Sequence, residues 1–351
     1  MAPTDKYQEA INFVERCGSI LGASKALGIA YSTMHDRYSR AKEKGYTANG
    51  IKEFSVPELP PLELPIEEII DQAARRFEQR HAGTKAREWF PVHINIGGPY
   101  ALAFVGDPHM DDDGCNWPLL KRDLKIINDT PGMFGVGMGD YLNNWVGRLA
   151  RLYGSQNSSQ HTGWRMMDWF LHSVNWTLLI RGNHDLFCGN NDPLDWMFTG
   201  SAAMADWSAK VKFVNPDGHE VRLNAAHSFK GHSQWNPVHG PMKAAKFSGL
   251  ADIYVQGHHH EWAMFQTEDS DRGRSYWALK ARGYKYIDQY ADLHGFGSQT
   301  YGASVVAIID PDCEGPAMVQ CFGDLAEAAR LLTLKREAWK AKHKKRSKCE
   351  A

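Results

Sequence analysis

The sequence predicts a layered α/β domain preceded by a small all-α domain. Between residues 92 and 323, short apolar runs each end in a polar cluster, and segments with helical periodicity lie between several of them. This alternation is typical of buried strands in a sheet that is covered by helices. Between residues 7 and 45, three short amphipathic segments separated by glycines predict three helices. A chain of 351 residues is long enough for both domains.

The composition limits the classes of protein to which the chain can belong. Hydrophobic residues at 43% and charged residues at 23% predict that most of the chain folds. The formal net charge of −1 argues against attraction of the whole protein to nucleic acid or membrane, although local patches can exist. The sequence has no secretory signal, no run of about 18 apolar residues and no CxxC pair among its six cysteines. We therefore expect a cytoplasmic protein with no membrane partner and no thiolate zinc site.

Four segments are predicted along the chain. Residues 1–47 form the three-helix domain, and residues 48–91 form an acidic, proline-rich linker with an amphipathic helix over 66–80, whose apolar side could pack on the next domain. Residues 92–325 form the α/β domain, and residues 326–351 form a tail with a strong excess of Lys and Arg. A frayed, solvated end and a non-specific affinity for a polyanion are both open for this tail.

The three-helix domain carries a motif with a functional meaning. Ser19 can cap its second helix, Gly28 ends that helix, and Ser32 can cap the third. Residues 18–34, GSILGASKALGIAYSTM, resemble the helix-turn-helix of Fis-like and homeodomain-like bacterial DNA-binding proteins. The resemblance implies that DNA is a partner and that the third helix lies along its phosphate backbone, with a module for protein contacts as the alternative. The candidate DNA-binding residues are Ser32, Thr33, Arg37, Arg40 and Lys44.

Polar motifs follow five of the predicted strands, which cover residues 101–105, 133–136, 176–180, 221–226 and 253–255. The motifs are Gly-Asp-Pro-His at 106–109, Gly-Asp at 139–140, Gly-Asn-His-Asp at 182–185, a single histidine at 227 and Gly-His-His-His at 257–260. In an extended Asp-x-His, both side chains can point to one side and bind the same metal ion. Carboxylates, imidazoles and an amide oxygen together suit Mn²⁺, Fe or Zn²⁺, so the series predicts a metal site at the strand ends.

In this order, the five motifs resemble those of the calcineurin-like metallophosphoesterases, over residues 107–260. The resemblance implies a layered metallophosphoesterase β-sandwich flanked by helices. It also implies two divalent metal ions, Mn²⁺ first, with Zn²⁺, Fe, Ni²⁺ or Mg²⁺ as alternatives. The implied ligands are Asp107, His109 and His260 for one ion, Asn183, His227 and His258 for the other, and Asp140 for both. The family chemistry is hydrolysis of a phosphoester by a hydroxide held between the ions, with His184 as general acid and Asp185 as the group that orients it.

The chain departs from its relatives directly after Asp140. Protein phosphatases of the family continue with an aspartate and an arginine, and the DNA-repair nucleases place a histidine where this chain has Asn143. Asn143 is therefore a catalytic candidate, and the arginine that grips phosphate in the phosphatases is missing. His232 is a rival of His227 as a ligand, His239 could contact substrate, and His259 should point away from the metal. The acidic residues 111–113 form a surface loop or attract a further cation.

A hydrolytic site joined by a linker to a DNA-binding module predicts a phosphodiesterase or nuclease that acts on DNA. The combination is similar to proteins encoded by phages and prophages. Cations alternate with aromatic residues over 277–290 and 295–301, either as a nucleic-acid surface or as ordinary strand surface. The alternative functions are a phosphomonoesterase or small-nucleotide phosphodiesterase, and a DNA-binding regulator with a non-catalytic phosphoesterase domain.

Overall fold

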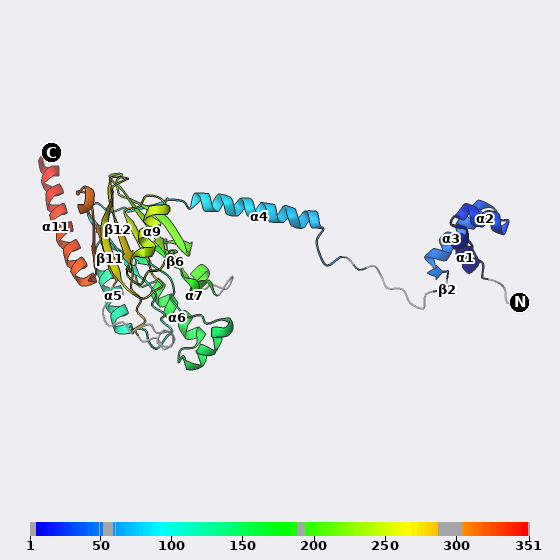
Figure 1. Cartoon of the computed structure of the whole chain (residues 1–351), viewed down its shortest axis with the longest axis horizontal. Helices are drawn as coiled ribbons and strands as arrows, with labels where there is room; N and C mark the ends of the chain where they lie inside the picture. The colour runs from blue at the N-terminus through cyan, green and yellow to red at the C-terminus, as the bar shows by residue number, and fades with distance from the viewer. Residues whose placement is uncertain are drawn as a thin grey trace. The chain divides into compact units, whose positions relative to one another are not determined.

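The structure is a computed structural model that describes residues 5–48, 50–51, 59, 61–187, 194–286 and 304–349. The chain divides into two compact units, Met1–Arg76 and Phe77–Ala351. The first unit contains three short helices and the first part of a longer helix that continues into the second unit, and the second unit contains two sheets with helices around them (Figure 1).

The first unit is built on α1 (Lys6–Cys17), α2 (Ile20–Leu27) and α3 (Tyr31–Glu43). Ser19 caps α2 by accepting a hydrogen bond from the backbone N–H of Gly22, and Gly28 ends α2 with a φ of 66° that favours glycine. The predicted cap at Ser32 is wrong, because α3 already begins at Tyr31. The side chains that pack together between the helices include Ala10, Val14, Ala23 and Met34.

A small hairpin that the sequence did not predict follows α3. It consists of β1 (Tyr46–Thr47) and β2 (Gly50–Ile51), which pair antiparallel. The hydroxyl of Tyr46 donates a hydrogen bond to the carboxylate of Asp5, the N-cap residue of α1. The hairpin therefore ties the segment after α3 back to the first helix of the unit.

Helix α4 (Ile66–Ala86) is longer than predicted and has no buried residue. Ile70 and Phe77, on the side that was expected to pack on a domain, are 59% and 68% exposed. That this side packs on the following domain stays a prediction. None of the described helices is both long and apolar enough to cross a membrane.

Among the described residues, two six-stranded mixed sheets form the second unit. One sheet has the order β11 (Ala263–Asp269), β12 (Arg274–Lys280), β10 (Ile253–Gln256), β9 (Glu220–Ala226), β8 (Ser208–Val214) and β3 (Phe90–His93). The other has the order β14 (Val319–Phe322), β13 (Val305–Ile309), β4 (Tyr100–Val105), β5 (Met133–Gly137), β6 (Trp176–Arg181) and β7 (Ala203–Asp206). The five predicted strands correspond to β4, β5, β6, β9 and β10.

The sheets and helices form four layers, which the alternation along β4 makes clear. Its even-numbered residues, such as Leu102 and Phe104, pack between the two sheets, whereas its odd-numbered residues, such as Ala103, face helices. These helices are α5 (Trp117–Asp129), α6 (Gln160–Leu171) and α11 (Leu325–Cys349). On the far side of the other sheet, α9 (His239–Phe247) packs on Tyr254. The predicted α/β sandwich flanked by helices is confirmed.

Parallel pairing gathers the predicted motifs at one edge of the sandwich. Strands β4, β5 and β6 are neighbours and parallel, and so are β9 and β10 in the facing sheet. The carboxyl ends of neighbouring parallel strands lie at the same edge of a sheet, and the loops that follow them form sites. One short helix, α7 (Asn183–Leu186), follows β6 at this edge. The other short helices of the unit are α8 (Leu194–Met197) and the 3-10 helices η1 (Gly147–Ser155) and η3 (Gly315–Ala317).

The first part of the basic C-terminal segment packs on the folded domain. Three apolar side chains of α11 are buried in the core: Leu325, Ala328 and Leu332. Further along, the ring of Trp339 lies so close to Gly98 that a Cβ on this glycine would be 2.6 Å from it. Lys335 also pairs with Asp310 at 2.7 Å. The apolar periodicity of the first turns therefore outweighs the basic composition that suggested solvent.

We predict that Leu332→Ala lowers the free energy of unfolding of the second unit by about 2 to 5 kcal/mol, since it leaves a cavity in the core. Leu334 is 62% exposed, so Leu334→Ala is the matched control and should cost less than about 0.5 kcal/mol. Urea titration followed by tryptophan fluorescence reports the unfolding of the second unit alone, because all 12 tryptophans follow residue 76. Equal losses in the two variants would contradict the packing of α11.

Candidate metal centre

Three groups of side chains at this edge could each hold a metal ion. They are Asp107, His109 and His260; His109, Asp140 and His184; and Asp140, His227 and His258. Within each group the ligand atoms lie within 4.8 Å of one another. Because His109 and Asp140 each belong to two groups, the three form one continuous cluster. The oxygen of Asn183 joins it 3.1 Å from Nε2 of His227, so the structure brings together all seven residues that the sequence assigned to metal.

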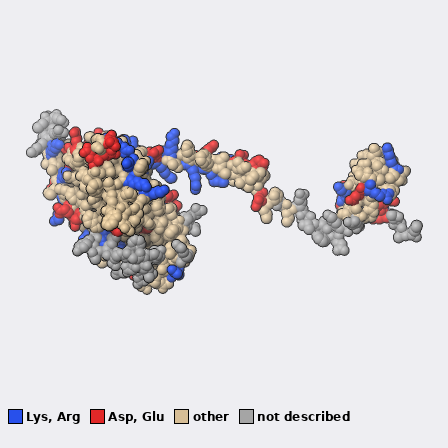
Figure 2. Space-filling model, viewed as in Figure 1, with Lys and Arg blue, Asp and Glu red and all other residues tan. Residues whose placement is uncertain are grey.

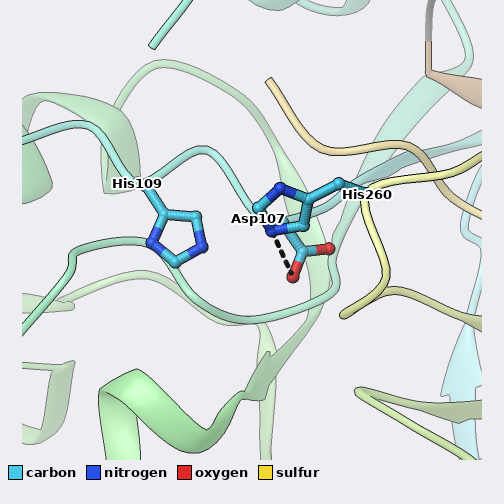
Figure 3. Close-up of side chains that lie close together, drawn as sticks. All are labelled: Asp107, His109 and His260. Atoms are coloured by element: carbon cyan, nitrogen blue, oxygen red, sulfur yellow. Dashed lines mark ion pairs between the residues drawn. The ribbon is translucent and has the colours of Figure 1, made fainter. Parts of the chain in front are cut away.

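The first predicted ligand set combines residues from both sheets (Figure 3). Asp107 and His109 follow β4, and His260 follows β10. Nε2 of His260 lies 3.9 Å from Oδ1 of Asp107, and the rings of His109 and His260 are 5.2 Å apart between centroids. The backbone N–H of His258 donates to both oxygens of Asp107, at 3.0 and 2.9 Å. This bond joins the two sheets across their seam.

The second set is tighter and centres on His227. Its Nε2 lies 3.0 Å from Nδ1 of His258, 3.1 Å from Oδ1 of Asn183 and 3.2 Å from Oδ2 of Asp140. Metal–ligand bonds of about 2.1 Å place neighbouring ligand atoms roughly 3 Å apart. The spacing of these four atoms therefore fits a single cation among them.

Hydrogen bonds on the far side of two imidazoles determine which nitrogen faces the cluster. Nδ1 of His227 lies 2.8 Å from the carbonyl oxygen of Met138, which can only accept, so Nδ1 carries the proton. Nδ1 of His109 lies 2.9 Å from Oδ1 of Asn143, whose amide is oriented because its Nδ2 donates to Asp112 at 2.8 Å. Both Nε2 lone pairs are left for the cluster. At His227 this lone pair faces two oxygen acceptors, on Asp140 and Asn183, and Nδ1 of His258, and a cation bound to all four atoms satisfies them where one shared proton does not.

Asp140 lies between the two ligand sets. Its Oδ2 is 3.2 Å from Nε2 of His227 and 3.9 Å from Nε2 of His109. Its Oδ1 accepts the backbone N–H of His184 at 2.9 Å, which holds the carboxylate in this orientation. The position is that of a carboxylate able to contact two ions at once.

The cluster concentrates negative charge in a buried place. Burial, together with Asp140, raises the pKa of Asp107 to about 7. Burial also opposes ionisation of Asp140, but the neighbouring imidazoles, His227 foremost, outweigh it and hold the pKa of Asp140 below its usual range. Burial lowers the pKa of His227, but Asp140 and Asp107 outweigh it and raise that pKa to about 10. In the absence of metal, the imidazolium of His227 thus supplies the positive charge that a divalent cation would supply.

The backbone of the ligands is strained. Five of the seven have φ between 42° and 71°: Asp107, His109, Asp140, His258 and His260. This left-handed region is uncommon for residues other than glycine and costs about 1 kcal/mol or more at each. The expectation of an extended Asp-x-His is therefore wrong. Two left-handed residues around Pro108, and not the alternation of a strand, bring Asp107 and His109 to one cluster.

The candidate general acid, His184, lies in α7 beside the cluster. Its Nδ1 is hydrogen-bonded to the backbone carbonyl oxygen of Asn143, and its ring is 4.9 Å from the ring of His109. A carbonyl only accepts, so Nδ1 carries a proton and Nε2 is the nitrogen available for proton transfer. The group that supports this histidine is therefore the main chain of Asn143, which a sequence comparison of side chains does not reveal.

Asp185 has a different role from the one predicted. Its carboxylate accepts the backbone N–H groups of Gly182 at 2.8 Å, Asp140 at 2.7 Å and Tyr141 at 3.1 Å. The expectation that Asp185 orients the imidazole of His184 is therefore wrong. Asp185 instead joins the loop after β5 to the loop after β6 and so positions Asp140.

Two aromatic residues beside His184 were missed by sequence reasoning. The rings of Trp145 and Phe187 lie 5.0 and 5.2 Å from the imidazole of His184, between centroids. Phe187 follows His184 by three positions, which is about one helical turn, so the spacing offered a signal. Trp145 had no such signal, because only the fold brings it to His184.

The acidic residues after the first motif are not a surface loop. Asp111 is 3% exposed, and it accepts the backbone N–H of Asn143 at 2.7 Å and the side-chain amide of Gln156 at 2.9 Å. Asp112 pairs with Lys285 at 2.9 Å. Only Asp113 of the three is exposed, so the surface expectation is wrong for Asp111, which supports the loop that carries Asn143.

The remaining candidates lie apart from the cluster. His232 lies against His259, 5.5 Å between ring centroids, and belongs to none of the three groups among the described residues. Over 277–286, Lys280, Arg282 and Lys285 are buried and do not form an exposed cationic surface. The other aromatic and polar residues of this prediction, in 287–303, lie outside the described residues.

The sequence matches no family model and no curated protein sequence. Among solved structures, the chain is similar to an archaeal phosphodiesterase, with 16% identity, 64% of this chain and 99% of the other covered, and a TM-score of 0.34. It is also similar to Vps29 from Chaetomium thermophilum, with 10% identity, 62% and 80% covered, and a TM-score of 0.34. A predicted phosphoesterase from Streptococcus pneumoniae TIGR4 is 10% identical, with 65% and 100% covered and a TM-score of 0.28.

We predict that Gly182→Ala abolishes metal binding at the second ligand set. A Cβ at this position would lie 2.1 Å from Oδ1 of Asp140 and 2.6 Å from Cε1 of His227, so both ligands must move. Metal per chain, measured by mass spectrometry after reconstitution with Mn²⁺, should fall by about one ion or more. Gly154→Ala is the control, because a Cβ there meets nothing within 4 Å. Unchanged metal content in Gly182→Ala would show that the ion lies elsewhere.

Proposed function

We propose that this chain is a phosphodiesterase that hydrolyses DNA with two divalent metal ions, Mn²⁺ first. The observation that carries the proposal is the position of Oδ2 of Asp140 between two sets of ligand atoms, with the imidazole of His184 held beside both sets. Two-metal centres of this kind are used to displace an oxygen on phosphorus. A zinc site that only stabilises a fold is usually closed by four ligands and has no second cation site.

The residues divide between the two ions as the motifs suggest. One ion would be held by Asp107, His109 and His260, the other by Asn183, His227 and His258, and Asp140 would contact both. When bound, such ions supply positive charge against the phosphate and lower the pKa of water. The mixed oxygen and imidazole donors suit Mn²⁺, Fe and Zn²⁺ better than Mg²⁺.

The chain itself supplies the proton for the leaving oxygen. His184 has Nδ1 bonded to the carbonyl of Asn143, which leaves Nε2 to donate a proton when the imidazole is charged. The rings of Trp145 and Phe187 flank this imidazole and limit the approach of water to it. The donor is thus fixed in both tautomer and direction before substrate binds.

The charges around the cluster favour a phosphodiester over a phosphomonoester. A monoester carries more negative charge, which the phosphatases of the family meet with an arginine. Among the described cations near the cluster, Lys280 pairs with Glu261 and Lys285 with Asp112, both at 2.9 Å. Arg181 pairs with two aspartates in the same way. Arg282 has no acidic partner among the described residues, but it is buried, and its guanidinium lies over the ring of Tyr286 at 4.4 Å. The metal ions are therefore left to bind the single charge of a diester.

The three-helix unit supports DNA as the diester. Thr33, Arg37, Arg40 and Lys44 recur every three or four positions along α3 and its C-cap, on a side of the helix about a quarter turn from the buried residues Met34 and Ala41. A cationic helix side of this kind can lie along phosphates, and the linker keeps the catalytic unit near the bound DNA. Arg40 is paired with Asp36 in the free protein, at 3.0 Å, so binding to phosphate must displace this pair.

We predict that His184→Gln lowers kcat for bis-p-nitrophenyl phosphate by about 10² to 10⁴, because the general acid is lost. Bound Mn²⁺ per chain should stay at the wild-type value, since His184 is not assigned to either ion. His161→Gln, an exposed histidine of α6, is the control and should keep wild-type kcat. Wild-type protein that hydrolyses p-nitrophenyl phosphate faster than the bis ester would make the chain a phosphomonoesterase. Protein that hydrolyses neither ester would make it a binding protein.

We predict that Arg37→Ala/Arg40→Ala weakens binding of the full chain to duplex DNA and lowers the slope of log K against log salt by about 1.8, for two lost phosphate contacts. Fluorescence anisotropy with a labelled duplex in EDTA measures both quantities without cleavage. Arg16→Ala/Lys25→Ala removes the same charge from exposed positions on α1 and α2 and should leave the slope unchanged. Equal slopes in both double variants would assign the unit to protein contacts.

A further inference from the structure

A cleft of about 1660 Å³ opens in the second unit next to the metal centre. It is larger than the roughly 300 to 1,000 Å³ of pockets that enclose a small ligand. Its walls are the C-terminal end of α4 with the residues after it, β7 and β8, the end of β9 and one side of α9. A space of this size can hold part of a polymer.

The cleft carries an excess of free positive charge. Its three acidic residues pair with two of its cations, Asp195 and Asp206 with Arg181 and Glu88 with Lys210, which leaves one negative charge uncompensated in these pairs. Four further cations have no acidic partner among the described residues: Lys85, Arg87, Lys230 and Lys243. In the view of Figure 2, Lys and Arg side chains also gather on the face of the domain beside the end of α4. A partner with repeated negative charges matches this arrangement.

Exposed aromatic rings line the same cleft. Trp207 is 38% exposed and Phe247 is 74% exposed. The indole N–H of Trp207 donates to the carbonyl oxygen of Ser228 at 3.0 Å, so the ring is held in place before any partner binds. Fixed aromatic rings between cations are the feature with which proteins bind unpaired bases and phosphates together.

Two residues of the cleft wall lie next to residues of the metal centre. Trp207 contacts the ring of the proposed ligand His227, 5.4 Å between centroids. At its rim lies Leu186, the last residue of α7, the short helix that also carries Asn183 and His184. A strand that leaves the cleft over Leu186 therefore arrives at the proposed proton donor.

We propose that this cleft binds single-stranded DNA and leads it to the metal centre, an inference that rests on the proposed function. Lys85, Arg87, Lys230 and Lys243 would contact phosphates, and Trp207 would stack on a base. A duplex does not satisfy the cleft, because its bases are paired and stacked on one another and are not free to stack on Trp207. The strand in the cleft is thus distinct from the duplex proposed for α3.

The test measures binding of a fluorescein-labelled oligothymidylate of about 12 nucleotides by anisotropy. It uses the full chain in EDTA, with Arg37→Ala/Arg40→Ala in every variant to remove the proposed contribution of α3. We expect Lys230→Glu/Lys243→Glu to raise Kd by about tenfold or more and to lower the salt slope by about 1.4, the value for two contacts to a single strand. Trp207→Ala should raise Kd by about tenfold through lost stacking, with the salt slope unchanged.

The matched control is Lys121→Glu/Lys340→Glu, which makes the same change in charge at exposed positions outside the cleft and should keep Kd within about twofold. Circular dichroism melting of each variant tests folding. A control that loses as much affinity as the cleft variant would overturn the proposal, and so would polyglutamate that competes as well as oligothymidylate. Hydrolysis of bis-p-nitrophenyl phosphate in Mn²⁺ is measured separately. Its absence refutes the proposed function, whereas hydrolysis without oligothymidylate binding refutes the cleft alone.

Discussion

The buried carboxylates of Asp107 and Asp140, at the seam between two sheets, are the constraint on which the rest of the site depends. Neither is more than 2% exposed, and two negative charges so close together in a dry place need a compensating cation. Imidazoles from both sheets stabilise these carboxylates, and so do backbone N–H groups such as that of His258, which donates to Asp107. His227 is one of these imidazoles, and it is hydrogen-bonded across the seam to the carbonyl oxygen of Met138. The contacts that join the two sheets here are therefore also contacts that hold the metal ligands.

This arrangement requires the backbone to come unusually close to the ligands. A Cβ on Gly257 would lie 2.6 Å from Oδ2 of Asp107, and one on Gly139 would lie 2.8 Å from Nδ1 of His227. The glycines of the motifs are thus needed for space, and the left-handed ligands beside them store strain that the rest of the sandwich must hold. Such strain persists only on a rigid support, which the six-stranded sheets behind the loops provide.

The sequence could predict the strands and the metal ligands, because both are determined by the pattern of residues next to them in the chain. The apolar runs of β4 and β6 identify strands because both are buried on two faces, and the motifs identify ligands because each follows such a strand. Roles that depend on partners distant in sequence could not be read in this way. Asp185 bonds to main-chain groups more than 40 residues away, and the burial of Asp111 depends on the loop around Asn143. The basic composition after residue 334 likewise concealed that Leu332 of the same helix is in the core.

Asn143 shows how the departure from the family's pattern can still make a working site. Its side-chain oxygen fixes the tautomer of His109, a proposed metal ligand, while its main-chain oxygen fixes the tautomer of His184, the proposed acid. A main-chain acceptor does the second task whatever side chain is present, so position 143 is free to serve the metal ligand. Its amide is in turn oriented by Asp112, and its backbone N–H by Asp111. One residue thus links metal binding to proton transfer, and the acidic residues after the first motif support that link.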